Sequence, residues 1–152
     1  MFKRLTSTLA LTLFALPLVA QDAPPAAPPP FKPFTQAETD RYMARGKQIM
    51  AWYLGGHADS VHAAFAPEVS AEMTIDLVRQ QRDVFEERAG TVLKVVAEKM
   101  TRRNGVPQYW WEADVANFSA EPVVMRWLFN EQLQVVGVGF NPKSRAPSDP
   151  EG

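Results

Sequence analysis

The feature that most constrains the fold of this chain is a change of hydrophobic period at Gly90. Beyond it, apolar and polar residues alternate in four segments: TVLKVVAEKM (91–100), QYWWEADVANF (108–118), PVVMRWLF (122–129) and LQVVGVGF (133–140). A period of two is typical of a strand with one buried face. Because short links join consecutive segments, we predict a four-stranded antiparallel meander.

The first link contains Arg103, Asn104 and Gly105. A two-residue loop at Asn104 and Gly105 would mix polar and apolar residues on both faces and bring Lys94 and Glu98 to the aromatic side. A three-residue loop with Gly105 in the left-handed region makes one face wholly apolar, so we predict that loop. It pairs Leu93 with Val115, Val95 with Ala113 and Ala97 with Trp111.

The same argument predicts a three-residue loop at Ser119, Ala120 and Glu121. The apolar side then pairs Val115 with Met125, Ala113 with Trp127 and Trp111 with Phe129. On the opposite side, Asp114 would lie between Lys94 and Arg126, with Glu112 beside it. We therefore interpret both carboxylates as solvent-facing, since cross-strand pairs of opposite charge favour one register.

Three helices are predicted before the sheet. Thr35 and Glu38 have the spacing of a capping box, and an apolar stripe follows to Leu54. A short second helix lies in HADSVHAAFAPE (57–68), with Pro67 after its end. The third begins after Ser70 and ends at Gly90. The expected fold class is α+β, with three N-terminal helices packed on a curved meander.

The two ends of the chain differ from this central part in composition. Residues 1–20 have the basic start and short apolar run of a secretory signal, which is cleaved or else retained as an anchor. Residues 21–34 are rich in proline and are interpreted as a stiff spacer, with a Pro-rich ligand as the alternative. Residues 143–152 are a flexible tail. One domain, residues 35–142, remains.

Composition narrows the class of protein. The chain has no cysteine, so an exported domain would depend on core packing rather than disulfides. Loss of the signal would leave 14 basic against 17 acidic residues. This balance argues against a nucleic-acid partner. We expect an exported protein, periplasmic or extracellular, of the bacterial envelope, which contacts a membrane only if the signal is uncleaved.

A set of residues at element joins points to a family. These are Leu54, Gly55, Asp59, Val61 and Phe65 between the first two helices, Gly90 before the sheet, and Val135, Gly137 and Val138 in the last strand. With them, residues 38–141 resemble the exported bacterial domain of unknown function 3887, in the nuclear transport factor 2-like superfamily.

That resemblance implies a cone-shaped α+β fold and an extracytoplasmic domain, and it brings no catalytic set. Members of the superfamily bind a small apolar molecule in the mouth of the cone, catalyse reactions there with an acid and a tyrosine, or pair through the outer sheet face. The fold alone does not choose among these functions.

Two groups of residues are candidates for binding. A ligand pocket would use the inward rings, which alternatively just fill the cone: Tyr53, Tyr109, Trp111, Trp127 and Phe129. A partner surface, for a homodimer or another envelope protein, would use apolar residues of the outer face: Trp110, Val96, Val124 and Leu128.

Metal and catalytic sites have less support. His57 and His62 are five residues apart, which does not place them on one helix face, so no metal or cofactor is expected. The leading hypothesis is non-enzymatic binding of a small apolar ligand or a protein partner. The alternative is an isomerase- or hydratase-like enzyme with its active site in the cone, which would need a buried acid.

Overall fold

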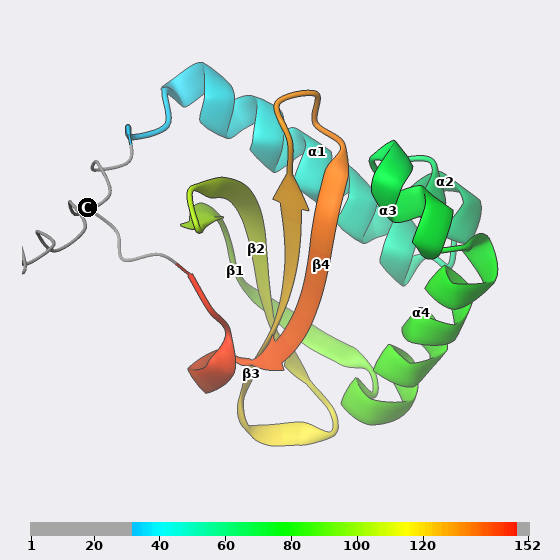
Figure 1. Ribbon diagram of the computed structural model, residues 1–152. Helices are drawn as coiled ribbons and strands as arrows, with labels where there is room; N and C mark the ends of the chain where they lie inside the picture. Colours follow the sequence, from blue (N-terminus) through cyan, green and yellow to red (C-terminus); the bar gives the residue numbers. More distant parts are fainter. Residues whose placement is uncertain (1–31, 149–152) are drawn as a thin grey trace, which may run out of the picture.

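Four helices precede a four-stranded antiparallel sheet in the computed structural model, which describes residues 32–148 (Figure 1). The helices are α1 (Gln36–Leu54), α2 (Ala58–His62), α3 (Pro67–Glu72) and α4 (Ile75–Ala89). The strands are β1 (Val92–Arg103), β2 (Val106–Val115), β3 (Phe118–Phe129) and β4 (Val135–Pro142), and a short 3-10 helix, η1 (Lys143–Arg145), follows. The predicted signal and residues 21–31 of the spacer lie outside the described residues.

The predicted α+β class and the meander are confirmed, with strand order β1-β2-β3-β4. The start of α1 is also as predicted. Thr35 Oγ1 accepts a hydrogen bond from the Glu38 backbone N–H at 3.2 Å, and the Glu38 carboxylate accepts one from the Thr35 N–H at 2.8 Å. This capping box satisfies backbone donors that the first turn of a helix leaves free.

The prediction of three helices is wrong, because the segment after α2 holds a separate short helix, α3. Pro67 is in its first turn and so begins this helix instead of following α2. Proline suits that place, since the first N–H groups of a helix need no intrahelical acceptor. The last helix, α4, starts later than predicted, where Thr74 Oγ1 accepts from the Leu77 N–H at 3.3 Å.

The predicted three-residue loop between β1 and β2 is also wrong. Arg103 pairs with Val106 across a two-residue turn, in which Asn104 and Gly105 have φ of 51° and 78°. Two positive φ angles are typical of the tight hairpin turn that Asn-Gly favours. As a result Glu98, rather than Ala97, lies opposite Trp111 on the helix side of the sheet.

A bulge between Val95 and Ala97 changes the register again farther along the strand. An extra residue in one strand shifts the pairing by one position beyond it. The predicted pairs of Val95 with Ala113 and of Lys94 with Asp114 are therefore present, although the turn differs.

The link between β2 and β3 is shorter than predicted. Val115 pairs with Phe118, and Trp111 lies opposite Met125 instead of Phe129, a displacement of four residues. From Gln108 to Ala113 the displacement is even and keeps the side chains on their predicted faces, because side chains alternate with a period of two. A register shift follows between Ala113 and Val115. The displacement does move Arg126 away from Asp114 to a place opposite Trp110, so the predicted Lys-Asp-Arg ladder is wrong.

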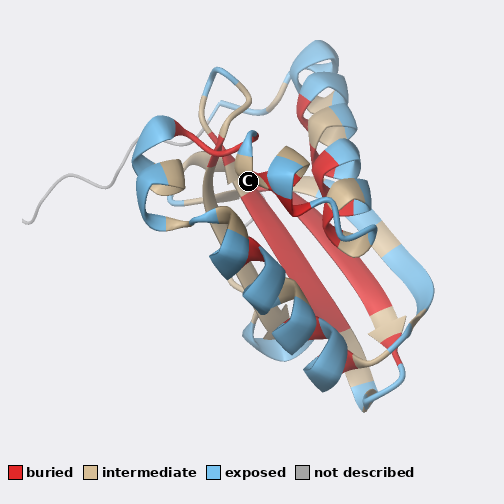
Figure 2. Ribbon diagram, turned by 90° about the vertical axis from the view of Figure 1, so that its right-hand side faces the viewer, coloured by how far each residue is buried: buried red, intermediate tan, exposed pale blue. Residues whose placement is uncertain are grey.

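The inner face of the sheet packs on the helices, as the alternation predicts. Buried strands lie behind helices whose outer surfaces are exposed (Figure 2). Gly46 permits a close approach of α1 to β2, since a Cβ at this position would lie 2.1 Å from Cγ of Tyr109. The core includes five inward side chains of the sheet that are at most 2% exposed: Tyr109, Trp111, Met125, Trp127 and Phe129.

The outer face is not the solvated charged surface that we predict from the sequence. It buries residues of β2 and β3, namely Gln108, Trp110, Glu112, Val124 and Arg126. The segment after β4 lies against it. Lys143 Nζ binds Glu112 Oε1 at 2.7 Å, and the Pro147 carbonyl accepts a hydrogen bond from Gln108 Nε2 at 3.2 Å. Residues 143–148 of the predicted tail thus have a defined place on the sheet.

Candidate functional site: an apolar cavity between α4 and the sheet

A cavity of about 270 Å³ lies between α4 and the inner side of β3 and β4, and residues of α1 and α2 also line it. The helices contribute Tyr53, Val61, Val78, Gln80, Gln81, Val84, Phe85 and Arg88, and Phe65 follows α2. The strands contribute Met125, Trp127, Val138, Gly139 and Phe140. Most of this lining is apolar, as in sites for small organic molecules.

Local sequence explains which side chains reach the cavity. Val78 and Phe85 are seven residues apart, so they lie on one stripe of α4. In β4, Val138 and Phe140 pair with Trp127 and Met125 and share their inward face. Both sets point into the same gap because α4 packs beside the edge strand of the sheet (Figure 1).

Aromatic contacts and one hydrogen bond hold the walls. The Phe85 and Phe140 rings meet edge to face with centroids 5.0 Å apart, and those of Tyr53 and Trp127 do so at 5.6 Å. The Tyr53 hydroxyl donates to the Gln81 carbonyl at 3.2 Å, which joins α1 to α4. These contacts fix the positions of the elements that form the walls of the cavity.

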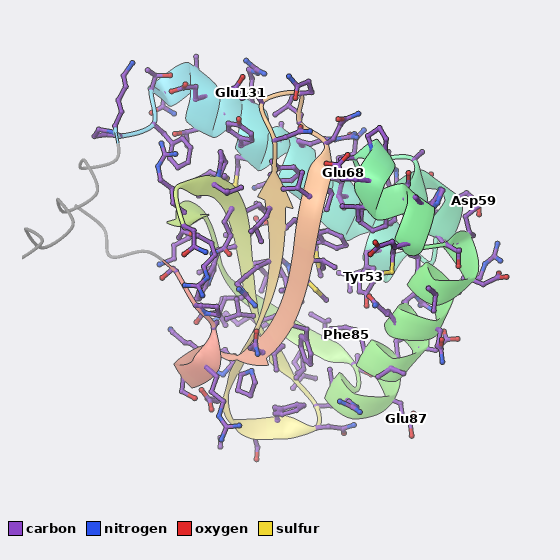
Figure 3. The ribbon with its side chains drawn as sticks, in the orientation of Figure 1. Tyr53, Asp59, Glu68, Phe85, Glu87 and Glu131 are labelled. Carbon is purple, nitrogen blue, oxygen red and sulfur yellow. The ribbon has the colours of Figure 1, made fainter. Side chains whose placement is uncertain are left out.

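The electrostatics of the cavity are simple. Tyr53 and Arg88 are the ionisable residues of its lining. Burial raises the pKa of Tyr53 well above its ordinary value, so the hydroxyl stays a neutral donor at physiological pH. Asp59 and Glu87 belong to the neighbouring helices but lie at the periphery, away from Tyr53 and Phe85 (Figure 3).

The buried Trp127 indole Nε1 is a further polar atom of the lining residues. It has no hydrogen-bond partner within residues 32–148. A buried donor without an acceptor costs free energy, about 1–3 kcal/mol, and is therefore uncommon in folded proteins.

Two of the five predicted pocket residues line the cavity, and three do not. Tyr53 and Trp127 line the cavity, whereas Tyr109, Trp111 and Phe129 lie in the filled part of the core. Sequence reasoning missed Val84, Arg88 and Phe140. The alternation of β4 could have predicted that Phe140 faces inward. The position of α4 beside that strand follows from tertiary packing alone.

The four predicted partner residues also differ from one another in exposure. Trp110 and Val124 are buried, at 5% and 0% exposed. Leu128 is half-buried, and Val96 is 43% exposed on the edge strand β1. They do not form the continuous exposed apolar surface that we predict from the sequence.

An acid does lie on the inner side of the sheet, outside the cavity lining. Glu98 accepts a hydrogen bond from the Tyr109 hydroxyl and binds Lys47 Nζ at 2.9 Å. Desolvation raises the pKa of Glu98, but the bonds from Tyr109 and Lys47 and the Lys47 charge together hold it below its ordinary value. Burial, and then the bond to Glu98, raises the pKa of Tyr109.

Glu112 is also buried, contrary to prediction, but on the outer face. Its carboxylate accepts hydrogen bonds from Trp110 Nε1 at 3.2 Å and from Lys143 Nζ at 2.7 Å. These two partners occupy both carboxylate oxygens, which is the arrangement that a buried charge requires. The contacts are those of a structural ion pair.

A second hollow, of about 310 Å³, lies near the end of α4. Arg82 and Glu86 line it and form an ion pair at 2.5 Å, and Arg82 also donates to the Leu54 carbonyl at 3.4 Å. Because its charged groups are bound to each other, this hollow offers fewer free groups for binding a ligand than the apolar cavity does.

Metal-binding and membrane-spanning features are absent from residues 32–148. No group of three or more His, Asp or Glu side chains there is placed to hold a metal ion. His62 lies near the Ser70 carbonyl at 3.3 Å, and His57 is exposed. None of the described helices combines the length and the apolar character needed to cross a membrane.

Comparison of the chain with protein-family models, curated proteins and solved structures finds no significant match.

Proposed function

We propose that this protein is an exported, non-enzymatic binding protein that holds a small apolar molecule in the cavity between α4 and β4. The observation that carries the proposal is the cavity itself, a space of about 270 Å³ with aromatic and aliphatic walls. Burial of apolar surface is the main driving force for such binding, at roughly 25 cal/mol per Å² removed from water.

The nuclear transport factor 2-like resemblance supports this proposal, as does the order of elements. Helices precede a meander, and the cavity lies where the sheet meets α4. Export is part of the proposal because of residues 1–20, whose pattern is that of a secretory signal.

The enzymatic alternative rests on one specific observation, the pair of Glu98 and Tyr109. An acid and a tyrosine are the groups that reactions in related cones use, and this pair faces the helices. Tyr109 is fully buried, however, and neither residue lines the cavity. A general base must reach the proton that it removes, so the binding protein is the better supported function.

Val84 offers a direct test of the binding proposal. It lines the cavity and is 37% exposed, so a larger ring at this position would cover the opening without disturbing the core. We expect the neutral fluorophore N-phenyl-1-naphthylamine to bind the purified protein with increased emission. Val84→Trp should lower its affinity at least about tenfold, a loss of 1.4 kcal/mol.

Leu77 provides the matched control, since it lies on α4, is 40% exposed and does not line the cavity. Leu77→Trp should bind the fluorophore like the wild type. Equal binding by both variants, or no binding by the wild-type protein, would contradict the proposal. Turnover of a hydrophobic carbonyl compound that is lost in Glu98→Gln would favour the enzyme instead.

A further inference from the structure

Arg88 is the one charged residue in the lining of the apolar cavity, and its position is the starting point of this inference. It lies in the last turn of α4, one turn after Val84. Its exposed guanidinium is therefore at the open side of the cavity, in contact with both water and any ligand that fills the apolar part.

The other two arginines of α4 are neutralised by carboxylates. Arg79 binds Asp76 at 2.8 Å and Asp59 at 3.3 Å, and Arg82 binds Glu86 at 2.5 Å. Arg88 has neither an ion pair nor a hydrogen bond to any residue of the described part of the chain. Its helical neighbours four and three positions earlier, Val84 and Phe85, carry no charge, and α4 ends at Ala89, so the usual helical pairing is not open to it.

Further polar side chains of the cavity lining come from two glutamines of α4, about two turns before Arg88. Gln80 and Gln81 line the same cavity, and no carboxylate does. Their side-chain amides make no hydrogen bond to described residues, so their N–H groups are free to donate. A guanidinium in a lining that contains no carboxylate is a favourable partner for a carboxylate or similar anion.

The volume of the cavity limits the size of the ligand. Roughly nine water molecules of about 30 Å³ each would fill 270 Å³, and a methylene group is of similar size. The cavity therefore has room for a single chain of about eight to ten carbon atoms. A lipid with two long chains is too large.

Resting on the function proposed above, we propose that the cavity binds a single-chain anionic amphiphile, whose tail lies among Phe85, Trp127 and Phe140 and whose anionic head group pairs with Arg88. The tail supplies the affinity and the head group supplies the selectivity. Arg88 is in this sense a specificity-determining residue rather than a structural one.

Three ligands with the same ten-carbon tail test the inference: decanoate, 1-decanol and decylammonium. Each is titrated into the full-length protein by calorimetry at pH 7, below the concentration at which it forms micelles. We expect decanoate to bind about fivefold more tightly than 1-decanol, as for an exposed charge pair, and decylammonium to bind most weakly. Salt should reduce the advantage of decanoate.

Two variants make the assignment specific. Arg88→Gln should reduce the affinity for decanoate to that for 1-decanol and leave 1-decanol unchanged. Arg41→Gln removes an exposed arginine of α1 outside the cavity and changes net charge equally, so it should alter neither affinity. Equal wild-type affinities for decanoate and 1-decanol, or no effect of Arg88→Gln, would overturn the inference but leave the binding function intact. Failure of all three ligands to bind would overturn both.

Discussion

The two faces of the sheet bury side chains by different means. The inner face packs aromatic rings of β2 and β3 against α1 and α4, and its contacts are almost wholly apolar. The outer face buries Gln108, Glu112 and Arg126 under the segment after β4. The difference shows that a buried face can be polar when its charged groups have hydrogen-bond partners. Glu112 pairs with Lys143, and the Arg126 guanidinium donates to Asn141 Oδ1 at 2.6 Å, although its Nε has no partner within residues 32–148.

The largest effect is expected on the inner face, at Gly46. A Cβ there would lie 2.1 Å from Cγ of Tyr109, so Gly46→Ala must move α1 or the ring. We expect a loss of about 2 kcal/mol in the free energy of unfolding, since overpacking exceeds the gain in helix propensity of about 1 kcal/mol. Urea denaturation of the purified variant would measure it.

Gly137→Ala is the matched control for Gly46→Ala. A Cβ at Gly137 would meet Leu128 at 3.7 Å, an ordinary contact. This variant should unfold within about 0.5 kcal/mol of the wild type. A loss at Gly46 as small as that at Gly137 would mean that the inner face adapts to an added methyl group, which would remove the contrast with the outer face.

A smaller loss is expected on the outer face, where Lys143 pairs with Glu112. Lys143→Met keeps an apolar stem of similar length but leaves a buried carboxylate with one hydrogen bond, from Trp110. We expect a loss of about 1–2 kcal/mol, less than for a fully buried pair because Lys143 is half exposed.

A double-mutant cycle separates charge from packing in this pair. Glu112→Gln removes the carboxylate charge, so Lys143→Met should cost less in that background than in the wild type. An identical cost in the two backgrounds would contradict the idea that polar pairing holds the C-terminal segment on the sheet.

The smallest effect concerns the acid on the inner side, Glu98, and its dependence on pH. Its pKa in the folded protein is below the ordinary value of 4.5, so its contacts stabilise the fold above that pH. The contribution is lost as the pH falls from about 4.5 through the lowered pKa, when the carboxylate becomes protonated in both states.

Glu98→Gln tests this dependence. At pH 7 the variant should be less stable by under about 1 kcal/mol, as for a partly exposed ion pair. The difference from the wild type should shrink as the pH is lowered below 4, in denaturation curves recorded at each pH. A difference that is constant with pH would show that Glu98 acts through shape alone.

Much of the fold was predictable because it depends on local patterns. The capping box at Thr35, the apolar stripe of α1 and the alternation after Gly90 follow from neighbours within a few residues, and all appear in the structure. The lengths of the turns were not predictable in this way, because the apolar pattern of the strands favours a three-residue loop that the structure does not contain. In the structure the preference of Asn104 and Gly105 for a tight turn determines the loop, and a bulge at Val96 adjusts the register.

The candidate site was predictable only in part. Tyr53 and Trp127 could be assigned inward from their spacing, but Arg88 could not be connected with them. It is 35 residues from Tyr53 in the chain, on a helix whose place beside β4 depends on packing between Phe85 and Phe140. Patterns along a chain contain no information about such distances.

The amino-acid sequence by itself determined that helices precede a four-stranded meander and which residues of β2 and β3 face inward, because these features depend on periods of 3.6 and two residues. Tertiary structure decided which faces are covered. It placed the C-terminal segment against Gln108 and Glu112, and it left a cavity where α4 meets β4. The physical reason is that coverage depends on contacts between residues far apart in the chain, whose side-chain volumes and charges must match in space.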